Sequence, residues 1–210
     1  MLKPEIVALP KRYRTNLINS LSGFKSGNLI GTISPNGQEN LAIFTSVVHL
    51  GANPALMGFI MRPVSVPRHT YENIIETGSF TINHIATNFY KKAHQTAARY
   101  DRERSEFLEV GLTPFYTEHI KAPYVQESKV KIGLSFVEKL EIKANGTQMI
   151  IGAIEEILVP PELILSDGYL DLEKAETVAV SCLDGYHRTE QLARLTYAKP
   201  DLEPRVIGKT

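Results

Sequence analysis

Short apolar runs separated by turn residues make up most of the chain, and this pattern is typical of antiparallel β-strands. The runs Asn28–Ser34 and Asn40–Val48 flank Pro35-Asn36-Gly37, whose residues accept the backbone geometry of a tight turn. These two runs therefore predict a hairpin. The run Ala55–Met61 is apolar at almost every position, which indicates a strand that is covered on both faces or lies in a closed barrel.

Between residues 70 and 110, the spacing of apolar residues predicts short helices on both sides of one strand. We expect a short helix that begins at Thr70, whose hydroxyl suits an N-cap, and stops at Gly78. Ser79–Ile85 alternates apolar and polar residues and predicts another strand. Ala86–Tyr100 has a weakly amphipathic helical pattern, and Glu106–Val110 predicts a shorter helix. We expect these last two segments to form a lid on the barrel.

The second half of the chain contains a longer hairpin. Its arms are Val130–Lys143 and Gln148–Val159, and Asn145-Gly146 between them is a strong turn signal. Val178–Leu183 predicts a last strand. Long hairpins interrupted by short helices predict a mainly β fold, a β-barrel with helical excursions, because barrel closure removes exposed strand edges. A β-sandwich remains the alternative architecture, and we expect residues 1–210 to form a single domain.

Charge and cysteine content exclude several classes of protein. The 23 Lys and Arg residues balance the 23 Asp and Glu residues, so no basic field is available to hold nucleic acid or an anionic membrane. The single cysteine, Cys182, excludes an internal disulfide, fits a reducing compartment and is expected to be a small buried strand residue. The apolar stretch Ile6–Leu9 is too short for a secretory signal, and no run is long enough to span a membrane. We therefore expect a soluble, cytoplasmic protein without a metal site.

Short motifs in a particular order give a more specific indication. They are Asn40-Leu41-Ala42-Ile43-Phe44-Thr45-Ser46, Asn53-Pro54-Ala55-Leu56, His69-Thr70-Tyr71-Glu72-Asn73-Ile74, Gly78-Ser79-Phe80-Thr81-Ile82-Asn83, Ser105-Glu106-Phe107, Gly111-Leu112-Thr113, Ala122-Pro123-Tyr124-Val125, Glu127-Ser128, Gly185-Tyr186 and Tyr197-Ala198-Lys199-Pro200. As an ordered set, these motifs resemble the flavin reductase-like family with the FMN-binding split barrel. That family includes flavoredoxin-like proteins and the reductase components of two-component monooxygenases.

The resemblance implies FMN as the cofactor, NADH or NADPH as the electron donor and a homodimer. It also implies a monooxygenase or another electron acceptor as a partner. FMN brings a planar apolar ring and a phosphate, so its site needs an apolar wall beside hydrogen-bond donors and a cation. The residues expected to bind it are Phe44, Thr45, Ser46, Val47, Arg62, Pro63, His69, Thr70, Asn83, His94 and Tyr186. Hydride transfer to a flavin needs no side chain as acid or base, so we assign no catalytic residue.

Several of these residues have a second interpretation. A phosphate between Arg62 and Thr70 would meet a guanidinium, a hydroxyl and the free N–H groups of a helix start, but the two could instead be a surface residue and a simple cap. Asn83 is either a flavin contact or a buried amide that bonds to the backbone. A lone histidine such as His94 is more often a packing residue. Tyr186 either covers the flavin or packs on a partner subunit.

Three functions are compatible with these observations. The leading one is an NAD(P)H-dependent flavin reductase that passes a hydride from nicotinamide to flavin. The second is an FMN electron carrier, similar to flavoredoxin, without nicotinamide turnover. The third is a ligand-binding barrel that is not an enzyme.

Overall fold

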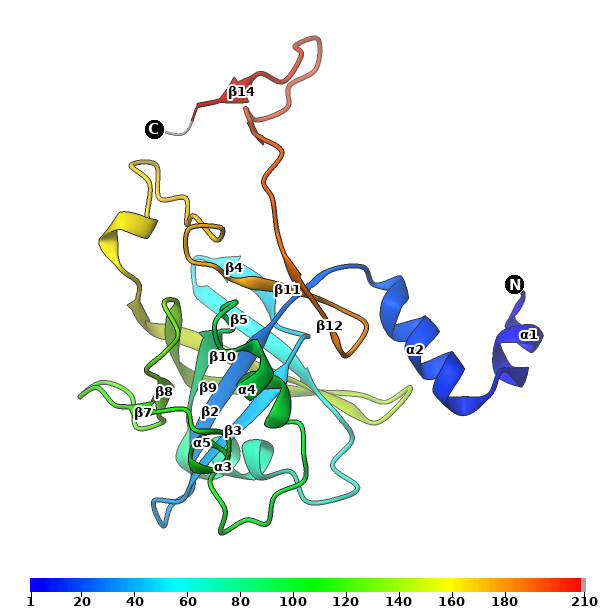
Figure 1. Ribbon diagram of the computed structural model, residues 1–210, viewed down its shortest axis with the longest axis vertical. Helices are drawn as coiled ribbons and strands as arrows, with labels where there is room; N and C mark the ends of the chain where they lie inside the picture. Colours follow the sequence, from blue (N-terminus) through cyan, green and yellow to red (C-terminus); the bar gives the residue numbers. More distant parts are fainter. Residues whose placement is uncertain (209–210) are drawn as a thin grey trace.

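The computed structural model describes residues 1–208, and its centre is a seven-stranded antiparallel sheet (Figure 1). In spatial order, its strands are β3 (Glu39–Phe44), β2 (Asn28–Ile33), β6 (Ser79–His84), β9 (Lys131–Ile142), β10 (Thr147–Leu158), β5 (Ala55–Met61) and β4 (Val48–Ala52). Both predicted hairpins are confirmed, since β2 pairs with β3 and β9 pairs with β10. The mainly β prediction is confirmed as well.

Hydrogen bonds of the Ser46 side chain connect the end of β3 to β5 and so close the sheet into a barrel. Ser46 follows the edge strand β3, and its hydroxyl both donates to the carbonyl of Ile60 on β5 and accepts the Ile60 N–H, each at 3.1 Å. This side chain thus occupies the place of a neighbouring strand. The result is a barrel that is split between β3 and β5, in agreement with the expected barrel architecture.

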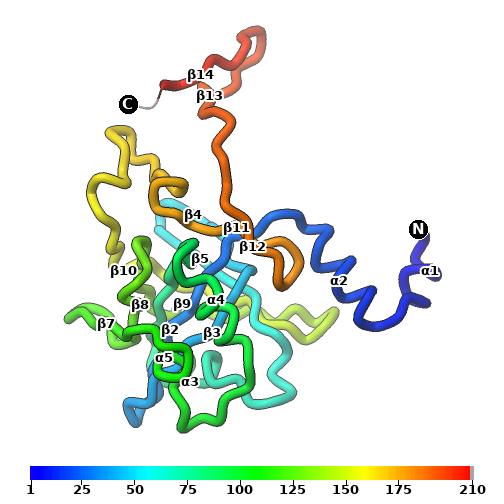
Figure 2. The backbone as a smooth tube through the Cα atoms, viewed as in Figure 1, coloured from blue at the N-terminus to red at the C-terminus, as the bar shows by residue number. Residues whose placement is uncertain are grey.

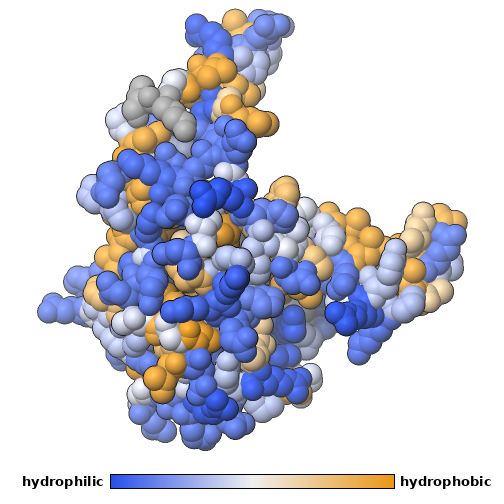
Figure 3. Space-filling model, viewed as in Figure 1, coloured by the Kyte–Doolittle hydropathy of each residue, from blue (hydrophilic) through white to orange (hydrophobic). Residues whose placement is uncertain are grey.

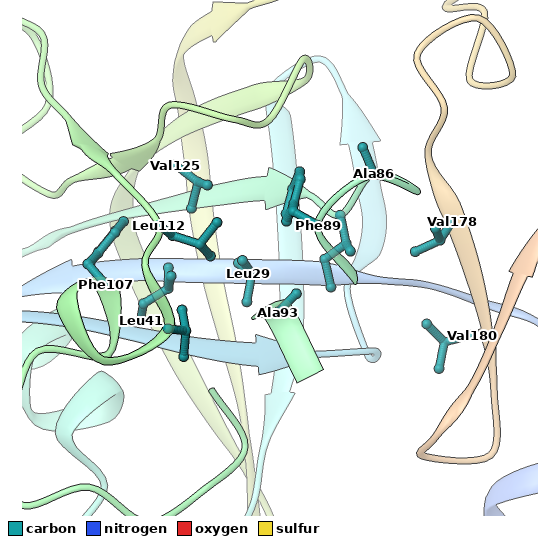
Figure 4. Close-up of a cluster of buried hydrophobic side chains, with 12 residues drawn as sticks. Leu29, Leu41, Ala86, Phe89, Ala93, Phe107, Leu112, Val125, Val178 and Val180 are labelled. Atoms are coloured by element: carbon teal, nitrogen blue, oxygen red, sulfur yellow. The ribbon is translucent and has the colours of Figure 1, made fainter. Parts of the chain in front are cut away.

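Two apolar cores lie on opposite sides of β2. Ile30 faces the barrel interior, where Phe59 meets Phe44 and Phe80 edge to face with ring centroids 4.8 and 5.7 Å apart. Leu29, one residue earlier, faces the outside, as the two-residue period of a strand requires. It packs there in a second core that the helices α4 (Tyr90–Gln95) and α5 (Glu106–Val110) complete (Figure 4).

The remaining elements surround this barrel. They are the helices α1 (Lys3–Ala8), α2 (Lys11–Leu21) and α3 (His69–Thr77), the 3₁₀ turn η1 (Pro161–Leu163), and the short strands β1 (Lys25–Ser26), β7 (Pro114–Phe115), β8 (Tyr124–Val125), β11 (Val178–Ser181), β12 (Gly185–Arg188), β13 (Arg194–Leu195) and β14 (Val206–Ile207). No helix in the described part of the chain is long and apolar enough to cross a membrane.

Three local predictions need correction. Helix α3 begins at His69, so Thr70 lies inside its first turn and makes no capping bond, although Gly78 ends the helix as predicted with a φ of 68°. Only Tyr90–Gln95 of the segment 86–100 is helical, because Ala86 pairs with Thr177 in an isolated β-bridge. Helices α4 and α5 cover the outer face of β2 and β3 instead of lying as a lid over the barrel.

Cys182 also differs from the expectation. It lies in the turn between β11 and β12, has a φ of 53° and is partly exposed. The strand β11 stops at Ser181, one residue earlier, so the cysteine does not belong to the buried core. The apolar residues on either side of it had made the strand look longer than it is.

Two arms extend from the barrel. Helices α1 and α2 project on one side, and the segment with β13 and β14 projects on another (Figures 1 and 2). No residue of α1 or α2 is buried, and apolar side chains are exposed on both arms (Figure 3). Leu21 and Tyr197 are examples, with 71% and 90% of their surface exposed.

Candidate functional site

A cleft of about 890 Å³ opens beside the split in the barrel. The end of β3, the end of β5, the start of α3 and the segment after α4 form its walls. Its lining residues are Asn19, Asn40, Ala42, Ile43, Phe44, Thr45, Ser46, Ile60, Met61, Arg62, Val66, Pro67, Arg68, His69, Thr70, His94, Thr96, Ala97, Ala98, Arg99, Tyr100, Asp101, Glu106, Leu183 and Asp184. The volume lies within the range of small-molecule and cofactor sites.

The cleft brings together seven of the eleven residues that the sequence suggested. These are Phe44, Thr45, Ser46, Arg62, His69, Thr70 and His94. The other four, Val47, Pro63, Asn83 and Tyr186, are not among its lining residues. Residues between positions 44 and 94 therefore line one cleft, although the elements that carry them are distant in sequence.

The lining of the cleft includes apolar residues of β3 and two arginines. Ala42, Ile43 and Phe44 line it from β3, where the Ile43 side chain packs toward the outer core and the Phe44 side chain toward the barrel interior. Arg62 and Arg68 also line the cleft and make no ion pair within residues 1–208. A flat ring and an anionic group would both find complementary surfaces here.

The hydroxyl of Thr70 is oriented by a buried amide. Asn40 Nδ2 donates to Thr70 Oγ1 at 3.0 Å, and both residues are about 6% exposed. Since this oxygen already accepts a hydrogen bond, the Thr70 hydroxyl proton is available to an acceptor in the cleft. The helix start adds N–H groups and a positive dipole end, so this corner of the cleft favours an anion.

The amide of Asn40 is held by a buried polar network. Thr32 Oγ1 accepts from Asn40 Nδ2 at 3.3 Å and from Asn73 Nδ2 at 3.1 Å. Arg102 donates to Asn73 Oδ1 at 3.4 Å and forms an ion pair with Glu72. This ion pair helps to keep the pKa of Glu72 low, although partial burial of the carboxyl acts in the opposite direction. The network fixes which way the Thr70 hydroxyl can donate.

Glu106 places a buried carboxyl in the same cleft. Its Oε2 accepts the backbone N–H of Leu41 at 2.9 Å, and only 7% of the residue is exposed. Burial raises the pKa of this carboxyl, against the hydrogen bonds that lower it. Glu106 belongs to one of the motifs that carry the family resemblance, but it was not among the residues expected to bind FMN, because its position depends on the packing of α5 against β3.

His94 and Tyr186 meet at the rim of the cleft. The Tyr186 hydroxyl lies 3.0 Å from His94 Nδ1, and the two rings pack edge to face. Burial, together with the charge of Asp184, raises the pKa of Tyr186 to about 12. Tyr186 therefore contacts the site through His94, without lining the cleft itself.

The three other predicted residues have structural surroundings. Asn83 is fully buried, donates to the carbonyl of Leu29 at 3.2 Å and accepts the N–H of Val125 at 2.9 Å. Val47 packs against the core in the barrel interior. Pro63 lies beside the turn at Gly146. Within the described residues, the amide of Asn83 is used by the protein and not by the cleft.

The structure adds site residues that the sequence did not indicate. Asn40, Arg99, Tyr100 and Asp101 line the cleft, and Asn19 reaches its rim from α2. Asn40 opened a predicted strand and one of the motifs that carry the family resemblance, but neither indicated its contact with Thr70. Arg99 and Tyr100 belong to the segment 86–100 that was predicted to be helical, which concealed their position outside α4. No group of three or more His, Cys, Asp or Glu side chains suitable for a metal occurs in residues 1–208.

Comparison with known proteins gives a family match over most of the chain. The model of the flavin reductase like domain matches residues 21–195. A solved structure from Shewanella frigidimarina NCIMB 400, assigned as a flavin reductase with split barrel domain, is 51% identical. The match covers 94% of this chain and 98% of that chain, with a TM-score of 0.91. At this level of identity, the similarity extends beyond the general fold.

More distant proteins share the fold. Nitrilotriacetate monooxygenase component B from Bacillus cereus is 18% identical over 93% of this chain and 98% of that chain, with a TM-score of 0.82. Flavoredoxin of Desulfovibrio vulgaris (Miyazaki F) is 24% identical over 85% and 92%, with a TM-score of 0.70. An uncharacterized protein from Aquifex aeolicus is 29% identical over 48% of this chain, and the match spans about half, 53%, of that protein.

Proposed function

The chain belongs to the flavin reductase like domain family, and on this premise we propose that it binds FMN in the cleft and catalyses flavin reduction by NADH or NADPH. The observation that supports this most directly is the pairing of an apolar wall on β3 with an anion-favouring corner at Arg62 and Thr70. A flavin ring needs the first and its phosphate needs the second.

The donor set of the cleft fits FMN. Thr70 offers a hydroxyl proton, Arg62 and Arg68 offer guanidinium groups, and the start of α3 offers backbone N–H groups. The β3 segment with Ala42, Ile43 and Phe44 would lie beside the ring. Bound FMN supplies the two-electron chemistry, and the protein contributes orientation and electrostatics.

The residues of the chain then have specific tasks. Asn40 orients the Thr70 hydroxyl so that it donates toward the phosphate corner. His94, held by Tyr186, limits the cleft on the side of α4. No side chain is required as a proton donor for hydride transfer, so these residues act through binding and orientation. This assignment keeps the phosphate end and the ring end of the cofactor in separate parts of the cleft.

We also propose that the protein is a homodimer. The arms with α1, α2, β13 and β14 carry exposed apolar side chains that have no cover within residues 1–208. A second copy would bury these surfaces, and Asn19 on α2 already reaches the cleft rim. The similarity in fold to a monooxygenase component B supports a second protein as the final electron acceptor.

Titration with FMN followed by steady-state assays tests the proposal. The purified protein should change the absorption spectrum of added FMN on binding and then oxidise NADH or NADPH in its presence. Protein that neither binds FMN nor oxidises either nucleotide would contradict the proposal. Binding of FMN without nicotinamide turnover would instead favour an electron carrier.

A substitution locates the phosphate. Arg62→Ala should weaken FMN binding by about 1–3 kcal/mol, because it removes a charge-assisted hydrogen bond. Lys143→Ala is the control, since Lys143 is an exposed cation in the turn between β9 and β10, lies outside both arms and does not line the cleft. Equal FMN affinity in the two variants would remove Arg62 from the phosphate site.

A further inference from the structure

Glu106 is a carboxyl group that is almost completely buried yet borders the proposed cofactor cleft. It lies at the start of α5, is 7% exposed and belongs to the lining of the cleft. Burial of a carboxylate away from a cation is unfavourable, and carboxylates in such places respond strongly to nearby charge. The proposed function does not require this group for hydride transfer.

The hydrogen bond of Glu106 explains its position but not its acidity. Oε2 accepts the Leu41 N–H at 2.9 Å, and Leu41 lies on the edge strand β3, where alternate N–H groups lack a neighbouring strand. The amide oxygen of a glutamine would accept the same N–H equally well. A purely structural role therefore does not require a group that can gain or lose a proton.

No cation compensates the Glu106 carboxylate within the described residues. Burial is the largest influence on its pKa, which is raised, and no charged neighbour contributes. The charged or titratable groups on the neighbouring elements are Glu39 on β3, Lys92 and His94 on α4, and Glu109 on α5, and those elsewhere in the cleft lining are Arg62, Arg68, His69, Arg99, Tyr100, Asp101 and Asp184. Several of these are already engaged, since Lys92 donates to the carbonyl of Gly111, Glu109 pairs with Arg104, and Glu39 accepts from Tyr116.

We propose that Glu106 takes up a proton from solvent when two electrons enter the cleft, and returns it when they leave. The inference rests on the proposed function, which supplies the electrons from a nicotinamide nucleotide. One O–H bond forms on the carboxylate, and the proton is supplied by the bulk solvent, from hydronium or buffer acid that releases it. The same bond breaks on reoxidation, so the carboxyl itself is neither oxidised nor reduced. Its neutralisation offsets the negative charge that the electrons bring.

The proposal has a definite electrochemical consequence. Negative charge in the cleft favours the protonated carboxyl, so Glu106 binds its proton more tightly after reduction than before. At pH values between the pKa of Glu106 in the oxidised protein and its pKa in the reduced protein, reduction takes up one additional proton. The equilibrium constant for reduction then changes an additional tenfold per pH unit. For a two-electron couple, this makes the midpoint potential fall by about 30 mV more per pH unit.

Redox titration of the FMN-loaded protein at a series of pH values measures this slope. The wild-type protein should show a window of steeper slope, and Glu106→Gln should lack it while it still binds FMN. Glu109→Gln is the matched control, because Glu109 lies on the same helix, does not line the cleft and pairs with Arg104 on the surface. It should keep the wild-type slope.

The possible results distinguish a failure of the proposed function from a failure of the inference about Glu106. Wild-type protein that fails to bind FMN overturns the proposed function and this inference with it. Binding of FMN with equal slopes in wild type and Glu106→Gln overturns the inference alone. If Glu106→Gln does not fold, a reduced-minus-oxidised infrared spectrum of the wild-type protein decides, since proton uptake requires a new carboxylic-acid band on reduction. Absence of that band at pH values across the window overturns the inference.

Discussion

The Thr70 hydroxyl gives the sharpest test of the phosphate corner. Thr70→Val keeps the shape of the side chain and removes the group that Asn40 orients at 3.0 Å. A hydrogen bond to a charged phosphate contributes about 1.5–3 kcal/mol, so FMN affinity should fall by about 10- to 100-fold. The substitution also leaves one Asn40 N–H without Thr70 as its acceptor, but the bond to Thr32 at 3.3 Å remains. Because the N–H that loses Thr70 is buried, the free energy of unfolding should fall by about 1–3 kcal/mol.

Binding of FMN and of riboflavin, measured by flavin fluorescence, distinguishes the phosphate from the ring. Thr70→Val should weaken FMN and leave riboflavin affinity unchanged, because riboflavin has no phosphate. Thr77→Val is the control, since Thr77 ends the same helix and its hydroxyl donates to the carbonyl of Asn73 at 2.8 Å. An equal loss of affinity for both flavins, or no loss for FMN, would refute the placement of the phosphate at α3.

Three further outcomes are expected. Gly133→Ala should lower the free energy of unfolding, measured by urea titration, by about 1–3 kcal/mol, because an added Cβ would lie 2.1 Å from the hydroxyl of the buried Tyr124. Stability equal to that of the wild type would contradict this. Burial lowers the pKa of His84 from 6.5 to about 4, so the unfolded chain binds this proton more tightly. The free energy of unfolding should then fall as the pH drops through this range, by at most about 1.4 kcal/mol per pH unit, and His84→Gln should show a smaller fall. Deletion of residues 1–22 should shift the sedimentation coefficient from dimer to monomer, and an unchanged value would count against the arm as an interface.

The local pattern predicted those elements whose ends are marked by residues close in sequence. The strand 55–61 was predicted with its observed ends, and Gly78 and Gly111 end their helices in the left-handed region. The helix predicted over 86–100 was too long because Ala86 pairs with Thr177, a contact between distant segments that no local pattern reveals. Cys182 was misplaced for a related reason, since a turn with positive φ interrupts its apolar surroundings.

In the site, too, short motifs marked some residues, whereas contacts between segments distant in sequence decide the role of others. Resemblance to a family marked residues 44–46 and 69–70, and the fold brings them to one cleft. Asn40 and Glu106 were part of the resembling motifs but were not predicted as site residues, because each acts across a long sequence separation, Asn40 on Thr70 and Glu106 on Leu41. Such pairs form when α3 and α5 pack against β3, and this packing follows from buried apolar side chains that carry no functional signature.

The position of the cleft follows from the incomplete closure of the barrel. An edge strand exposes unpaired backbone groups, which proteins usually have to cover. At β3 this edge is covered piece by piece, with Glu106 accepting the Leu41 N–H and Ser46 bonding to Ile60 of β5. The residues between these two contacts, 42–45, remain open to the cleft. A fully hydrogen-bonded barrel would have no such opening, so the same gap that weakens the sheet provides the surface on which we place the flavin.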